Sequence, residues 1–167
     1  MVALQEPAIR AVVLLAGGSR SLRVILEYQL SNGIKHNAKL SATQKDSALA
    51  QLPVKIDSIA GSDPWWSFIL SHDFTVEQKQ LAKPAVLILT GANDQQATPD
   101  QNPEIAANVR SSGNTDVTAR IIPGVNHLFV RDSDGFPGGY AKLPTPLLVE
   151  SGVIGIVADW LVSKLRS

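Results

Sequence analysis

Three apolar runs along the chain predict the strands of a parallel sheet. Residues 9–16 (IRAVVLLA) and 85–90 (AVLILT) are almost continuously apolar, which is typical of parallel strands buried on both faces. A third run, VTARII at 117–122, is rich in the β-branched side chains that strands favour. A glycine or a proline follows each run directly, so we expect each strand to end in a tight turn.

Between the strands, apolar residues recur at the three- and four-residue spacing of amphipathic helices. The segment SDPWWSFIL is predicted to be helical because Ser62 or Asp63 can cap its start and Pro64 suits the first helical position. Residues 31–62 are polar and mixed in pattern, with weak helical character near 42–52. The expected helices span residues 21–30, 62–70, 103–111 and 147–165, and the third turns Ile105, Ala106 and Val109 inward.

The order of these elements predicts the fold class. Strand, helix, strand, helix, strand, loop and helix in succession indicate an α/β protein, with a mostly parallel three-stranded sheet flanked by helices. The connection at 123–145 is rich in Gly, Pro and Asp and is long for a structureless loop, so it is a candidate for function. The first strand has the pattern of a core strand but no strand before it to pair with. We therefore expect half of a domain, whose sheet is completed by oligomerisation.

The composition is that of an ordinary globular protein and narrows the choice of partners. Fifteen Lys and Arg residues balance 15 Asp and Glu residues, and no basic run is present, so we expect no nucleic-acid partner. The absence of cysteine excludes disulfides and thiolate chemistry. No apolar run approaches about 18 residues and MVALQEPAIR lacks a signal-peptide pattern, so we expect no membrane partner. The chain as written is interpreted as cytoplasmic, and its original compartment stays open.

Residues able to carry chemistry follow all three expected strands. Ligand sites of open α/β sheets lie beyond the carboxyl ends of the strands, and there the sequence places Ser19, Asp94 and His127. Their order along the chain is the order found in α/β-hydrolases. The stretch LLAGGSRSL, which contains Ser19, is one residue short of the G-x-S-x-G nucleophile elbow.

The roles of these residues follow from the chemistry of acyl transfer. The hydroxyl of Ser19 would attack a carbonyl, His127 would take its proton, and Asp94 would orient the imidazole and stabilise the imidazolium. Backbone N–H groups of Arg20 and Ser21 at a helix start could stabilise the oxyanion, and Ser21 is a second candidate nucleophile. A Gly-Gly-Ser turn after a strand is also common for backbone reasons alone, so both interpretations of Ser19 stay open.

A longer stretch strengthens the hydrolase interpretation. Residues 84–129, PAVLILTGANDQQATPDQNPEIAANVRSSGNTDVTARIIPGVNHLF, resemble the C-terminal part of α/β-hydrolase-fold serine esterases, near the dienelactone-hydrolase and prolyl-oligopeptidase relatives. SDPWWSFIL and the ending ADWLVSKL also resemble the family's segments. The resemblance implies that Asp94 is the catalytic acid and that His127 is the catalytic base.

The same resemblance implies a departure from the family at its nucleophile. In such esterases the G-x-S-x-G elbow lies upstream of the strand that ends here in LLAG. By resemblance, Ser19 therefore lies in a turn beside the active site and does not occupy the nucleophile position. The turn around Ser19 therefore suggests a nucleophile, whereas the resemblance to the family implies that the nucleophile lies upstream of Ser19.

The remaining candidate residues have less specific patterns. Trp65 and Trp66 are predicted to line an acyl pocket, although aromatic residues on a short helix also serve as core or interface. His36 and His72 have no partner at ligand spacing and are interpreted as non-catalytic. The sequence predicts no metal site and no cofactor.

Together these observations predict a carboxylesterase-like hydrolase of small short-chain esters. The chain is expected to form one partial α/β-hydrolase domain over 1–167, with a strand, helix and cap-like segment at 1–62 and the acid- and histidine-bearing part at 63–167. An inactive hydrolase remnant that acts as an assembly partner is the alternative. The open edge of residues 9–16 predicts a homodimer or higher oligomer in either case, because an unpaired apolar strand edge recruits another strand.

Overall fold

The computed structural model describes residues 2–166, which form two compact units. One unit joins the residues up to Ser19 with those from Phe74 onward and holds all three strands. The other unit, Arg20–Asp73, is inserted in the chain between the first and second strands and is helical. The expected cap-like segment ended at residue 62, whereas the helical unit continues to residue 73.

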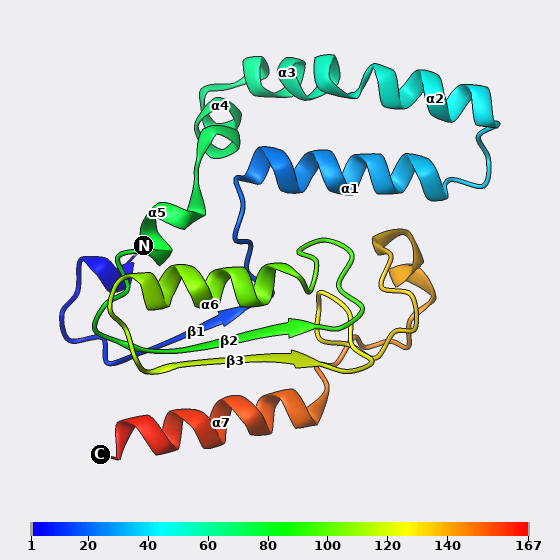
Figure 1. Ribbon diagram of the computed structural model, residues 1–167. Helices are drawn as coiled ribbons and strands as arrows, with labels where there is room; N and C mark the ends of the chain where they lie inside the picture. The colour runs from blue at the N-terminus through cyan, green and yellow to red at the C-terminus, as the bar shows by residue number, and fades with distance from the viewer. Residues whose placement is uncertain (1, 167) are drawn as a thin grey trace. The chain divides into compact units, whose positions relative to one another are not determined.

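The first unit is built on a parallel sheet of three strands (Figure 1). The strands are β1 (Ala11–Leu15), β2 (Ala85–Gly91) and β3 (Val117–Ile122), in the spatial order β1-β2-β3. Both pairings are parallel, with Leu14 opposite Ile88 and Thr90 opposite Ile121. The predicted α/β class with a three-stranded parallel sheet is confirmed. Because the strands are parallel, their carboxyl ends meet at one edge of the sheet.

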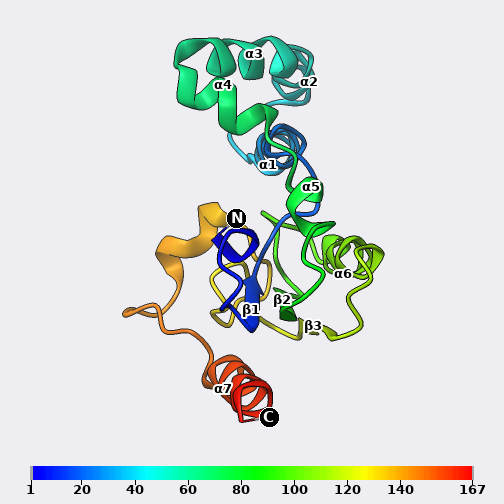
Figure 2. The same cartoon turned by 90° about the vertical axis from the view of Figure 1, so that its left-hand side faces the viewer.

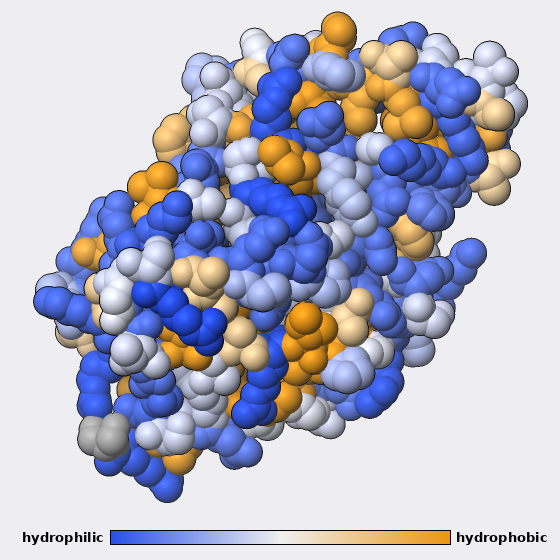
Figure 3. Space-filling view, in the orientation of Figure 1, coloured by the Kyte–Doolittle hydropathy of each residue, from blue (hydrophilic) through white to orange (hydrophobic). Residues whose placement is uncertain are grey.

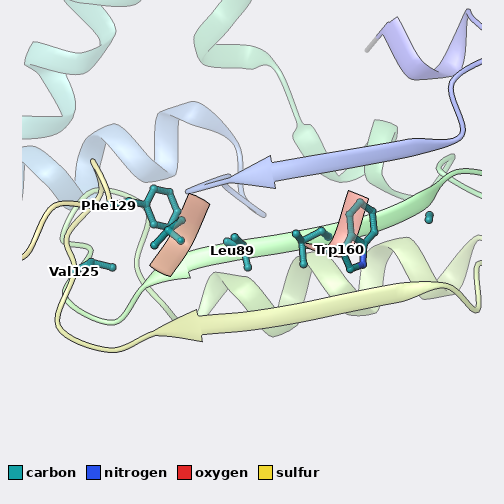
Figure 4. Close-up of a cluster of buried hydrophobic side chains, with 7 residues drawn as sticks. Leu89, Val125, Phe129 and Trp160 are labelled. Atoms are coloured by element: carbon teal, nitrogen blue, oxygen red, sulfur yellow. The ribbon is translucent and has the colours of Figure 1, made fainter. Parts of the chain in front are cut away.

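Helices cover both faces of this sheet, and β2 is buried along its whole length. Helices α6 (Gln101–Ser111) and α7 (Ser151–Leu165) lie on opposite faces (Figures 1 and 2). Alternate side chains of β2 therefore enter two separate cores. The core on the α7 side includes Leu87, Leu89, Val125, Phe129, Val153 and Trp160 (Figure 4). The core on the α6 side includes Val86, Ile88, Leu81, Ile105, Ala106 and Val109, so the predicted inward face of α6 is confirmed.

The expectation that the first strand is buried on both faces is wrong. Four residues of β1 are only partly buried, and Leu15 is 51% exposed. The physical reason is position: β1 lies at an edge of the sheet and pairs, within the described residues, with β2 alone. An apolar sequence shows that a strand can be buried, but the neighbouring elements decide whether it is.

In the first unit, the last helix starts later than expected, and several short helices were not expected. Helix α7 begins at Ser151 rather than near residue 147. The preceding residue, Glu150, has a non-helical backbone, and its N–H donates to the carbonyl of Phe129 at 2.8 Å. The long loop after β3 contains the short 3₁₀ helix η2 (Pro137–Lys142). Two further short elements are η1 (Val2–Leu4) and α5 (Phe74–Gln78).

The helical unit contains four helices, α1 (Leu22–His36), α2 (Ala42–Ala50), α3 (Leu52–Ser62) and α4 (Pro64–Ser71). The sequence pattern underestimated this unit, since α1 continues to His36 and α2 and α3 occupy most of the polar stretch. Local signals explain α2: Ser41 and Gln44 form a reciprocal capping box at its start. The expected cap of α4 is confirmed, because the carboxylate of Asp63 accepts a hydrogen bond from the N–H of Trp65 at 2.7 Å. No helix within residues 2–166 is long and apolar enough to cross a membrane.

Candidate active site

Asp94 lies in a tight turn that directly follows the central strand. The N–H of Asp94 donates to the carbonyl of Gly91 at 3.1 Å and closes the turn. The N–H of Ala92 donates to Ile122 at 2.8 Å, and that of Asn93 donates to Val125 at 3.0 Å. Hydrogen bonds to the end of β3 and to the loop after it therefore fix the position of Asp94.

His127 lies in that same loop, and a buried asparagine shapes the turn around it. The side chain of Asn126 is fully buried, and its oxygen accepts hydrogen bonds from the N–H groups of Leu128 at 2.9 Å and Val130 at 3.2 Å. Its amide nitrogen donates to the carboxylate of Asp132 at 3.0 Å. Asparagine side chains commonly stabilise turns in this way. The turn thus holds His127 between two anchored residues.

The two turns approach each other at positions where only glycine fits. A β-carbon added to Gly91 would lie 2.4 Å from the carbonyl oxygen of Val125 and 2.5 Å from that of Asn126. Gly135, with a φ of +71°, packs against Asn93, where an added β-carbon would meet the carbonyl oxygen at 1.6 Å. The absence of a side chain at Gly91 and Gly135 therefore lets the acid turn and the histidine loop pack together.

Asp94 and His127 form a hydrogen-bonded pair. Nδ1 of His127 lies 2.9 Å from Oδ2 of Asp94, whose side chain is completely buried. The other carboxylate oxygen, Oδ1, accepts hydrogen bonds from the backbone N–H groups of Gln96 at 2.8 Å and Ala97 at 2.9 Å. The His127 side chain is 29% exposed. The structure thus brings together two of the three residues that the sequence placed at strand ends.

This geometry defines the chemistry that the pair can perform. A carboxylate that accepts a hydrogen bond from Nδ1 fixes the imidazole tautomer, so the proton sits on Nδ1 and Nε2 is a hydrogen-bond acceptor. Within residues 2–166, Nε2 has no hydrogen-bond partner. The buried carboxylate would also stabilise the imidazolium formed when Nε2 takes a proton. The pair is therefore arranged as a general base.

Ser19 is placed differently from the sequence prediction of a nucleophile bonded to histidine. It is 3% exposed, and its hydroxyl donates to the carboxylate of Glu104 on α6. Its backbone N–H donates to the side-chain oxygen of Gln101 at 3.0 Å. Neither interaction involves His127, so the described conformation ties Ser19 to α6 and leaves the Asp94–His127 pair without it.

The other four predicted site residues belong to the helical unit. Ser21 precedes α1, and its side chain makes no capping hydrogen bond. Trp65 and Trp66 pack edge to face, with ring centroids 4.8 Å apart, and are 58% and 36% exposed. The roles of Arg20 and Ser21 at an oxyanion, and of the two tryptophans in an acyl pocket, stay predictions.

Tyr140 is a residue of this site that sequence reasoning missed. Its hydroxyl accepts a hydrogen bond from the side-chain amide of Gln96 at 3.2 Å and donates to the carbonyl of Gly135 at 3.4 Å. Burial and the nearby carboxylates of Asp94 and Asp132 raise the pKa of Tyr140, against hydrogen bonds that lower it. The phenol therefore links the acid turn to η2. In the sequence, the only indication of a role for Tyr140 was its place in the Gly- and Pro-rich loop at 123–145.

Asp132 is the second charged group that supports the histidine loop. Burial by itself raises its pKa, but hydrogen bonds from the Asn126 amide and from three backbone N–H groups outweigh this and hold the pKa below 3.8. The three donors belong to Ser133, Asp134 and Gly135. A carboxylate with a depressed pKa in the folded state stabilises that state at neutral pH.

This depressed pKa predicts a specific pH dependence of stability. Asp132 should stabilise the fold above the unfolded pKa near 3.8 and lose that contribution as the pH falls through its lower folded pKa. We expect Asp132→Asn to lower the free energy of unfolding by about 1 kcal/mol near pH 7. Urea unfolding at several pH values should show this difference shrinking toward pH 3. A difference independent of pH would contradict the assigned role of the charge.

No group of three or more His, Cys, Asp or Glu side chains able to hold a metal ion occurs in the part of the chain that the structure describes.

In comparisons with known proteins, the chain matches no family model and no curated sequence. The case for a function therefore depends on the geometry of the Asp94–His127 pair.

Proposed function

We propose that this chain is an ester hydrolase of the α/β-hydrolase type, in which His127 is the general base and Asp94 orients it. The proposal depends mainly on one observation. A fully buried carboxylate, held by two backbone N–H groups, lies 2.9 Å from Nδ1 of a partly buried histidine whose Nε2 is available. The order of the residues along the chain and the sequence resemblance described above support the same function.

The proposed reaction uses the pair to move one proton twice. Nε2 of His127 takes the proton of an attacking hydroxyl group as its oxygen bonds to the ester carbonyl carbon. The imidazolium, stabilised by Asp94, then gives that proton to the alkoxide as the carbon–oxygen bond of the ester breaks. The products are an acid and an alcohol. Short-chain carboxylic esters are the proposed substrates, and no cofactor takes part.

In this proposal Ser19 is not the nucleophile. A reacting hydroxyl must reach both Nε2 of His127 and the substrate, whereas the Ser19 hydroxyl is buried and bonded to Glu104. We propose that His127 activates a water molecule, which attacks the ester carbonyl. The alternative nucleophile, Ser21, is distinguished by a fluorophosphonate probe, which would label a reactive serine but not a site that uses water.

The deciding experiment compares wild type, His127→Ala and Ser19→Ala on p-nitrophenyl acetate and butyrate, and on ethyl acetate by pH-stat. We expect hydrolysis faster than buffer, a loss of about a hundredfold or more in His127→Ala, and a rate within about threefold of wild type in Ser19→Ala. The alkyl ester is included because a surface imidazole attacks only activated esters efficiently.

His36→Ala is the matched control, because it removes an exposed histidine from the helical unit. It should leave the hydrolysis rate unchanged. A hundredfold loss in Ser19→Ala would instead make Ser19 the nucleophile. Wild type no faster than buffer would reject the enzyme and favour the assembly-partner function.

The assembly-partner alternative is supported by a different observation. Strand β1 has no strand on its outer edge within residues 2–166, and Leu15 beside that edge is half exposed. Such edges pair readily with other strands. The homodimer or higher oligomer through residues 9–16 remains a prediction, and it is compatible with either function.

A further inference from the structure

The helical unit contains an apolar hollow that is separate from the Asp94–His127 pair in sequence and in lining. It lies between α1, α2 and α3 and has a volume of about 520 Å³. This volume is in the range of small-molecule binding sites. The apolar part of its lining is formed by Leu30, Ile34, Ala48, Leu52 and Val54.

The hollow exists because α1 and the α2–α3 pair are incompletely packed. Gln51 is both the residue that follows α2 and the residue before α3, so the two helices meet beside Leu52. Among the residues lining the hollow, only Leu52 is buried, and Val54 is 71% exposed. Apolar side chains are visible at the surface over α2 and α3 (Figure 3). A ligand with an aliphatic part would remove this apolar surface from water.

All three polar residues that line the hollow can donate hydrogen bonds. Gln51, Lys55 and Ser58 are spaced four and three residues apart, which places them along one side of α3. Lys55 is the one charged residue in the lining. Its ammonium group has no hydrogen-bond or ion-pair partner among residues 2–166. The hollow therefore combines an aliphatic lining with a single unpaired positive charge.

We infer that this hollow binds an amphipathic carboxylate, in chemical class a medium-chain fatty acid. The aliphatic chain packs against the five apolar side chains, and the carboxylate lies at the ammonium of Lys55 beside the hydroxyl of Ser58. The positive charge of Lys55 favours an anionic ligand, and the apolar lining favours a ligand with an aliphatic chain. This binding site does not depend on the proposed esterase activity.

A second hollow in the same unit shows why the charge matters. It measures about 430 Å³ and shares Leu52 with the first, but its lining contains both Glu27 and Lys35. Opposite charges in one lining give no net preference for an anion. The unpaired lysine is thus the feature that assigns the carboxylate to the first hollow.

The test titrates the full chain with octanoate, octanol and acetate, using calorimetry together with amide chemical shifts from NMR. We expect saturable octanoate binding, with the largest shifts at residues that line the first hollow. Lys55→Gln should weaken octanoate by about threefold and leave octanol unchanged, because a partly exposed ion pair contributes little more than this. Acetate, which lacks the chain, should not bind.

Two further variants separate the hollow from the helix surface. Ala48→Phe fills the hollow and should weaken octanoate and octanol at least about tenfold. Ala50→Phe alters an exposed position on the same helix outside the lining and should change neither affinity. Circular dichroism checks that both variants keep their helices. No saturable octanoate binding, shifts centred elsewhere, or an equal effect of Lys55→Gln on octanoate and octanol would overturn the inference.

Discussion

Asp94→Asn is expected to lower the kcat of ester hydrolysis by about 10⁴-fold while the fold is kept. The reason lies in the hydrogen bonds around the carboxylate. Oδ1 accepts from the N–H groups of Gln96 and Ala97, so the oxygen of the introduced amide must stay at that position. Its NH₂ group then faces Nδ1 of His127, which lies 2.9 Å from Oδ2 in the wild type.

This replacement reverses the tautomer of the histidine. An amide NH₂ donates, so Nδ1 of His127 would accept and the ring proton would move to Nε2. A protonated Nε2 cannot take a proton from a nucleophile. The kinetic measurement is therefore accompanied by ¹⁵N NMR of the imidazole, which reports the tautomer directly.

Asp116→Asn is the matched control for this substitution. Asp116 precedes β3 at the opposite end of the strand from the site, and its carboxylate pairs with Lys164 at the surface. The exposed pair contributes little to stability, so activity should not change. Activity of Asp94→Asn within tenfold of wild type would show that Asp94 does not set the tautomer in catalysis.

The second large effect is expected from Gly91→Ala. The added methyl group would collide with the carbonyl oxygens of Val125 and Asn126, both of which belong to the turn before His127. Since backbone cannot yield as a flexible side chain does, we expect a loss of about 3 kcal/mol in the free energy of unfolding. For a chain of this size that corresponds to a fall in Tm of about 6–12 °C.

Activity should fall together with stability in this variant. The collision pushes the histidine loop away from the acid turn, which lengthens the hydrogen bond between His127 and Asp94. Gly155→Ala is the control, because an added β-carbon at that position in α7 would meet no atom within 4 Å apart from its chain neighbours and the nearby backbone of its own helix. It should stabilise the protein by about 0.5–1 kcal/mol, since alanine favours helix over glycine. An unchanged melting temperature in Gly91→Ala would refute the close approach of the two turns.

Local chemistry in the sequence was enough to locate most of the elements. The strands at 85–91 and 117–122 and the inward face of α6 were predictable because apolar runs, helical spacing and breaker residues act over a few neighbouring positions. The same local patterns placed Asp94 and His127 directly after strands. Their meeting at one sheet edge then followed from the parallel arrangement expected of an α/β protein.

The prediction was wrong in two places, for two different reasons. The exposure of β1 depends on what lies at its outer edge, which its own apolar sequence does not encode. The longer helices of the segment 20–73 depend on capping by Ser41 and on packing between helices, whereas their apolar pattern alone is weak.

The sequence by itself thus determined the α/β class and the acid and histidine that could act together. Only the tertiary structure decided which atoms meet: it joined Nδ1 of His127 to Asp94 across 33 positions of the chain and bonded the Ser19 hydroxyl to Glu104 across 85. It also showed that Gly91 permits the first of these contacts. The physical reason is that side-chain hydrogen bonds form over about 3 Å in space, a distance that spacing along the chain does not specify.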